Sequence, residues 1–154
     1  MKRRTACLAL CVVIGVATAA NAEPRGREAR KEAARAMIKK TAVVILYAHE
    51  KVKENKVYTG DLARAVKHQR FAKQLYVQGR YLRAMDHTRR ARLLAFRAIK
   101  ANKGQAPAGS ELAVKDWAGM PADAELDAAL EKEMPGSATS DEAVTTTAQD
   151  LDVD

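Results

Sequence analysis

Cysteine is almost absent from this chain, and the two that occur, Cys7 and Cys11, lie close to its start. They precede the sequence Ala20-Asn-Ala22, which has the Ala-x-Ala form of a leader-peptide cleavage site. We therefore expect a mature protein that begins at Glu23 and contains no thiol. No disulfide can hold such a protein, although its compartment would permit one, and it must be stabilised by helix packing.

The start of the chain has the features of a secretory signal peptide. A basic Met1-Lys-Arg-Arg4 is followed by an apolar run from Ala6 to Ala19 that is too short to span a bilayer. We predict that residues 1–22 are a signal peptide, and that the mature protein is secreted, in the periplasm, and not integral to the membrane. An uncleaved anchor is the weaker alternative, because the cleavage site fits well.

The two commonest catalytic nucleophiles are also missing from the first part of the mature chain. Residues 23–104 contain neither serine nor cysteine, and the later serines (Ser110, Ser137 and Ser140) are far in sequence from every histidine. The acidic residues show no pairing typical of acid–base catalysis, and there is no glycine-rich phosphate loop. We therefore predict that the protein is not an enzyme.

Charge divides the mature chain into two parts. Residues 23–104 hold 22 Lys and Arg against 7 Asp and Glu, a net +15, whereas residues 105–154 hold 2 against 12, a net −10. We predict a basic domain over 23–104 and an acidic tail over 105–154. Within the tail, 121–134 is expected to be helical and 110–117, with the single Trp117, could form a short helix. The end beyond Gly136 has too few apolar residues to fold and should be disordered.

Apolar periodicity over the basic domain predicts an all-α fold. Helices are expected over about 27–55, 62–78 and 81–102, joined by short connections into an antiparallel three-helix body. Asp61 is the expected N-cap of the second helix. The segment Ala42–Tyr47 is apolar on all sides, which predicts that it is buried between other helices.

The second and third helices repeat each other. Residues 60–75 align with 79–94 without a gap, and seven of the sixteen positions are identical. The stretch Leu75–Ala91 resembles the centre of a tetratricopeptide repeat, with Gly79 and Tyr81 at the turn and Ala84 and Ala91 where the helices approach closely. This chain departs from the family pattern at three places. It lacks the early tryptophan and the terminal proline, and Thr88 stands where the family usually has an aromatic residue. The resemblance, which amounts to one repeat, implies a helical hairpin and a protein-binding role.

The three histidines of the chain, His49, His68 and His87, are spaced by nineteen residues. Each lies on an apolar helical stripe, and in an antiparallel body we expect all three at one level. Such a layer could bind Zn²⁺ or Cu²⁺, with water completing the coordination shell. The alternative is that each is a packed polar residue with an ordinary hydrogen-bond partner, in which case the protein has no cofactor.

Basic residues gather on the second and third helices, and we select Arg83, Arg90, Arg97, Arg64 and Lys67 as a candidate binding face. Export makes nucleic acid an unexpected partner, so we expect an envelope protein or an anionic envelope polymer. A solvated face is one alternative, and docking of the acidic tail onto the basic domain is another. The leading prediction is a non-enzymatic binding protein; the competing one is a small periplasmic metal-binding protein.

Overall fold

A computed structural model describes residues 22–112, 119–136, 139–147 and 150–153. They form five helices: α1 (Ala22–Asn55), α2 (Asp61–Val77), α3 (Tyr81–Ala101), α4 (Asp123–Glu133) and α5 (Asp141–Thr145). No strand occurs among these residues, and the all-α prediction is confirmed. The predicted signal peptide, apart from Ala22, lies outside the described residues, as do Trp117 and its neighbours 113–118.

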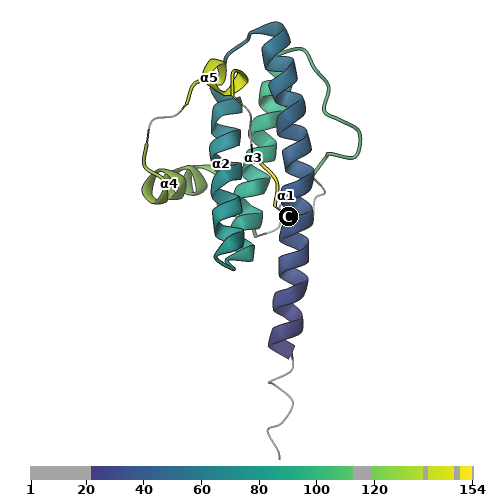
Figure 1. The fold of residues 1–154 in the computed structure, drawn as a ribbon, viewed down its shortest axis with the longest axis vertical. Coiled ribbons are helices and arrows are strands. Elements are labelled where there is room, and N and C mark those ends of the chain that lie inside the picture. The colour runs from purple at the N-terminus through teal and green to yellow at the C-terminus, as the bar shows by residue number, and fades with distance from the viewer. Residues whose placement is uncertain (1–21, 113–118, 137–138, 148–149, 154) are drawn as a thin grey trace, which may run out of the picture.

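The three long helices pack side by side, and each contacts the other two (Figure 1). Their bounds fall within a few residues of those predicted, except that α1 begins at Ala22 rather than near Arg27. The N-terminal part of α1 extends beyond the turn that joins α2 to α3 (Figure 1). Across the described part of the chain, none of the helices combines the length and hydropathy that crossing a membrane requires.

The core lies between the three long helices and is built largely from small and branched side chains. On α1 the buried stripe runs through Ile38, Ala42, Ile45, Ala48 and Val52, all at most 6% exposed. Alanines on α2 and α3, such as Ala65, Ala72, Ala91 and Ala95, let the backbones approach closely. The spacing of the stripe explains why α1 is a helix with one buried face.

The apolar segment of α1 is only partly covered. Val43 is 61% exposed and Leu46 is 47% exposed, whereas Val44 and Ile45 between them are buried. The prediction that this whole segment is buried is therefore wrong. Among the described residues, α2 and α3 are the only other long helices, and they cover one side of α1.

A hydrogen-bonded polar cluster crosses the middle of the bundle. Gln69 of α2 donates from Nε2 to the carbonyl oxygens of Ile38 (2.9 Å) and Leu151 (3.0 Å), and it accepts from the Thr88 hydroxyl at 2.6 Å. The Thr41 hydroxyl donates to the carbonyl of Thr88 at 3.4 Å. Unpaired polar groups at these buried positions would be costly, so the cluster selects one register of α1, α2 and α3.

The end of the tail folds back onto the bundle. The short helix α5 packs against α1 and α2, and Val144 and Leu151 are buried with the main core. The prediction of disorder beyond Gly136 is thus wrong for residues 139–147 and 150–153. Although this end has few apolar residues, Val144, Leu151 and Val153 are all buried, and they anchor it to the bundle.

Asp141 fixes this contact to the start of α2. Its carboxylate accepts from the backbone N–H of Gly60 and of Ala63, both at 2.7 Å. These are donors that a helix N-terminus leaves unpaired. Asp61, the predicted N-cap, is instead the first helical residue, and Gly60 at the cap position has no side chain to offer. The cap of α2 is therefore supplied by a residue about eighty positions further along the chain.

We expect Asp141→Ala to lower the free energy of unfolding by about 1–2 kcal/mol, because it removes a buried cap and leaves two backbone donors unpaired. Urea denaturation followed by circular dichroism measures this. Glu142→Ala is the matched control: Glu142 is the exposed neighbour, and its loss should change stability by less than about 0.5 kcal/mol. Equal effects of the two substitutions would contradict the capping role.

Candidate functional site

The candidate binding face is a surface formed by α2 and α3, and helix α4 of the acidic tail lies on it. Arg64 and Lys67 come from α2, and Arg83, Arg90 and Arg97 come from α3. Their spacings of three and of seven residues place them along one side of each helix. The turn at Gly79 sets these two helices side by side, which brings the two rows together as one face.

All five predicted residues are paired with carboxylates of α4. Arg64 contacts Asp127 at 2.5 Å, and Lys67 contacts Glu131 at 2.7 Å. Arg83 binds Glu133, and Arg97 lies 3.7 Å from Asp123. The structure therefore brings the predicted residues together, and they lie beneath a segment of the same chain.

Arg90 lies at the centre of the contact and is only 3% exposed. Its Nε and Nη2 donate to the two oxygens of Asp127 at 3.0 and 2.8 Å, and its Nη1 donates to Asp123. A guanidinium this buried requires a negative partner, and a two-pronged bond to one carboxylate is the strongest form that such a pair takes. Breaking the pair from either side would leave a charge without compensation.

The electrostatic environment holds these carboxylates in their charged form. Partial burial raises the pKa of Asp127, but hydrogen bonds from Arg90 and His68 outweigh it and lower the pKa to about 2. At the other end of α4, the hydrogen bond from Arg83 lowers the pKa of Glu133. The contact therefore consists of opposite charges throughout the neutral pH range.

Apolar side chains complete the contact between the charged rows. Leu126 and Leu130 of α4 are 5% and 3% exposed. Leu130 packs with Phe71, Leu75 and Ala84 of the bundle, and Met134 lies against the same cluster. Positions 126, 130 and 134 fall on one side of a helix, so α4 is amphipathic, with an apolar side towards the bundle and acids beside it. We call this contact surface of α2 and α3 the basic groove; its basic residues are Arg64, Lys67, Arg83, Arg90 and Arg97.

Two histidines lie beneath the groove and bond to each other. His68 and His87 are each 1% exposed, and their Nδ1 atoms are 3.0 Å apart. The Nε2 of His68 lies 3.0 Å from Asp127 Oδ1. Since a carboxylate only accepts, Nε2 of His68 carries the proton and its Nδ1 is the acceptor. It follows that His87 donates through Nδ1, which forms a chain from Asp127 to His68 to His87.

Both imidazoles of the pair are neutral at neutral pH. Burial lowers the pKa of His68 to about 4, in spite of the nearby Asp127. Burial, the neighbouring His68 and Arg83 lower the pKa of His87 to about 4 as well. The Phe71 ring meets His87 edge-on, with 4.7 Å between centroids, and adds to the apolar surroundings.

His49 does not join this pair, and the prediction of three histidines at one level is wrong. Thr41 is the residue of α1 that lies level with His87 of α3, because its hydroxyl bonds the carbonyl of Thr88. His49 lies eight residues further along α1, or about 12 Å at the helical rise. The register differs because the C-terminal end of α1 extends past the start of α2. Ile38, 17 residues before the end of α1, bonds Gln69, which lies only 8 residues after the start of α2. Among the described residues, no group of three potential metal ligands was found.

Several residues of the site were missed from the sequence, above all Asp123, Asp127, Glu131 and Glu133. The signal was present: the acids of 123–133 recur on one side of a helix next to Leu126 and Leu130, opposite in charge to a basic body. Docking of the tail was one of three alternatives for the basic face, and no local pattern selected it.

The comparisons with known proteins provide no further identification: no protein-family model, no curated protein and no solved structure matches this chain. The tetratricopeptide-repeat resemblance of the α2–α3 hairpin accordingly stays a prediction. Any functional conclusion depends on the site itself.

We expect the protein to lose stability in acid in two steps, set by the histidine pair and then by Asp127. The folded-state pKa of each histidine, about 4, is below the usual 6.5, so the unfolded chain binds more protons between pH 6.5 and 4. Stability should therefore fall as the pH falls through this window, by roughly 1.4 kcal/mol per pH unit for each histidine. Asp127, with its pKa lowered from 3.8 to about 2, adds a further loss below pH 3.8.

Urea denaturation at several pH values between 7 and 4 measures this dependence. His87→Gln should reduce the slope in that window, because it removes one of the two buried imidazoles. A slope that is the same in His87→Gln as in the unaltered protein would show that the pair does not cause the acid sensitivity. Replacing His49, which lies outside the pair, serves as the control.

Proposed function

We propose that this protein is an exported, non-enzymatic binding protein, and that its basic groove accepts an acidic amphipathic helix of a partner protein in place of α4. The observation that supports the proposal is that helix α4 of the same chain occupies the groove. All five residues selected for binding contact a helix of opposite charge in the structure, so α4 indicates which ligand chemistry the groove recognises. Helix-in-groove recognition through an apolar face is a recurrent mode of peptide binding.

The chemistry of the contact favours a protein over an anionic polymer. Each buried leucine contributes about 1.5–3 kcal/mol, which is more than an exposed ion pair does. A polymer of phosphates or acidic sugars has no side chains to take the places of Leu126 and Leu130. The planar, two-pronged pairing of Arg90 with Asp127 also fits a carboxylate well.

The connection of α4 to the bundle makes it a competitor of any partner. Residues 102–122 join α3 to α4. Because α4 is tethered to the bundle through this short stretch of chain, its effective concentration at the groove is on the order of 1 mM. An external helix must displace it, so the apparent affinity of the intact protein is lower than that of the open groove. The tail would thus restrict binding to partners whose helix fits better than α4.

The competing hypothesis, a metal site made of three histidines, loses its geometric basis. It required His49, His68 and His87 at one level, and His49 lies about 12 Å away along α1. His68 already uses both ring nitrogens, one towards Asp127 and one towards His87. We therefore propose no metal or other cofactor for the basic groove.

A peptide of residues 119–136, labelled with a fluorophore, tests the proposal. Leu126→Asp with Leu130→Asp in the full chain should release α4, because the two anchors can no longer be buried, while the groove on α2 and α3 stays unchanged. We expect fluorescence anisotropy to show the peptide binding this released variant at least about tenfold more tightly than the unaltered protein.

A second peptide, with Asp127→Asn, is the matched control for recognition. It keeps both leucines but loses the charge opposite Arg90, and it should bind the released variant at least about tenfold more weakly. Equal binding of the first peptide to the released and unaltered proteins would contradict the proposal, as would equal binding of the two peptides. Displacement of the first peptide by polyphosphate at similar occupancy would favour a polymer as the partner.

A further inference from the structure

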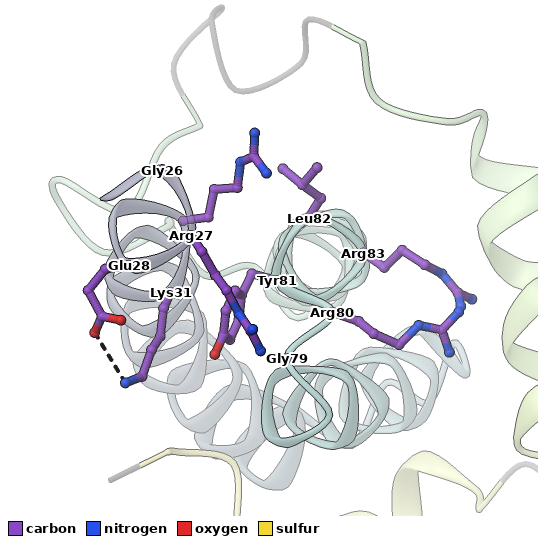
Figure 2. A pocket seen from close by; sticks show the side chains of 10 residues that line it. Gly26, Arg27, Glu28, Lys31, Gly79, Arg80, Tyr81, Leu82 and Arg83 are labelled. Atoms are coloured by element: carbon purple, nitrogen blue, oxygen red, sulfur yellow. Dashed lines mark hydrogen bonds and ion pairs between the residues drawn. The ribbon is translucent and has the colours of Figure 1, made fainter. Parts of the chain in front are cut away.

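A second basic surface lies at the opposite end of α3 from Arg97, in the angle between the projecting part of α1 and the turn that joins α2 to α3. A cavity of about 1180 Å³ opens there. Cations from both sides line it: Arg27, Arg30 and Lys31 from α1, and Arg80 and Arg83 from the start of α3. Figure 2 shows this cavity, with Arg27 crossing towards the turn and Arg80 and Arg83 pointing away from α1.

The turn at Gly79, which forms one wall of the cavity, is held by two hydrogen bonds and leaves room for the Arg27 side chain. Gly79 has a φ of +74°, and it ends α2 with the N–H groups of Gly79 and Arg80 bonded to the carbonyls of Tyr76 and Leu75 at 2.9 and 2.8 Å. This pairing is the Schellman motif, which strongly favours glycine. A side chain at Gly79 would also place its Cβ 3.0 Å from Nη2 of Arg27. The absence of a side chain thus lets the Arg27 guanidinium lie against the turn.

The charges in the cavity are balanced differently from those in the basic groove. Lys31 is paired with Glu28 at 3.2 Å, and both Arg80 and Arg83 contact Glu133. Among the described side chains, which begin at Arg25, none forms an ion pair with Arg27 or Arg30. These two arginines are three residues apart on one helix and both line the cavity, so an anion bound there would supply the negative charge that they lack.

The donors present suit a phosphate group with an organic part. Guanidinium groups bind phosphate through paired N–H donors, and a phosphate dianion has enough oxygens for two of them. The cavity is much larger than a phosphate ion, and its wall includes Tyr81 and Leu82, the latter 54% exposed. These two side chains can contact the apolar portion of a ligand whose phosphate lies at Arg27 and Arg30.

We propose that this cavity is a binding site for a phosphate-bearing organic ligand, with Arg27 and Arg30 holding the phosphate and with Tyr81 and Leu82 contacting the remainder. The proposal is independent of the basic groove, because neither Arg27 nor Arg30 contacts α4. The ligand is either a soluble phosphate ester or the headgroup of an anionic lipid, which share this chemistry.

The test uses the full chain and two probes: glycerol phosphate, followed by calorimetry, and vesicles of phosphatidylglycerol, followed by co-sedimentation with phosphatidylcholine vesicles as the reference. We expect at least one probe to bind, and R27Q with R30Q to weaken that binding at least tenfold. The control is R25Q with K39Q, which removes the same charge at exposed α1 positions that do not line the cavity; it should change binding no more than twofold.

Each outcome decides the proposal. Binding of glycerol phosphate supports it with a soluble ligand, and binding of the anionic vesicles alone supports it with a lipid, provided that only R27Q with R30Q is impaired. Equal losses in both double variants would overturn it, since the effect would then be one of net charge. Binding of neither probe to the unaltered protein would also overturn it, and would leave the proposal for the basic groove untouched.

Discussion

The folded protein depends on neutralising Arg90, a full positive charge that is 3% exposed at the middle of α3. Within the described residues its carboxylate partners are Asp123 and Asp127 of α4. Removing both charges from water costs free energy, so the ion pair adds little to the overall stability. It does favour one particular arrangement of α4 on the bundle, because either partner alone would be left buried and uncompensated. Docking of α4 supplies this negative charge in the structure, and α4 is held on the basic groove by leucines as well as by charge. Asp127 also accepts from His68, which links the surface contact to the buried histidine pair.

Polar groups inside the bundle specify how the long helices align. Ten of the 26 buried apolar residues in the described part of the chain are alanines, whose small side chains do little to distinguish one register from another. Gln69, Thr88 and Thr41 supply that distinction, since a shift of any helix would leave buried hydrogen-bonding groups unpaired. Arg92 extends the cluster: it is 4% exposed, and its guanidinium donates to the Thr41 hydroxyl at 2.8 and 3.0 Å and to the Met37 carbonyl at 3.1 Å. Asn102 acts similarly at the far end, where its side chain bonds both the N–H and the carbonyl of Val57.

The two basic surfaces of the molecule illustrate why a cluster of arginines in a sequence does not by itself define a site. On the groove, every selected residue has a carboxylate partner from the tail, so any ligand has to compete with the chain itself. In the cavity near Gly79, Arg27 and Arg30 lie on a part of α1 that extends past the bundle, and no described carboxylate pairs with them. The composition of the two surfaces is alike. They differ because the acidic tail pairs with every selected residue of the groove, whereas in the cavity it pairs with Arg80 and Arg83 but not with Arg27 or Arg30 among the described side chains.

The sequence by itself determined the all-α class, the three long helices and the turn at Gly79, because apolar periodicity and turn-forming residues act within a few positions of one another. The distribution of charged residues along the sequence also determined the division into a basic domain and an acidic tail. The tertiary structure alone decided the level of His49 relative to His68 and His87, the cap that Asp141 provides for α2, and the covering of Arg90 by α4. Each of these is a pairing between groups 33 to 81 residues apart, or follows from one. Such a pairing depends on how far each helix slides along its neighbour, and that is decided by the buried polar groups and charges once the helices are packed together.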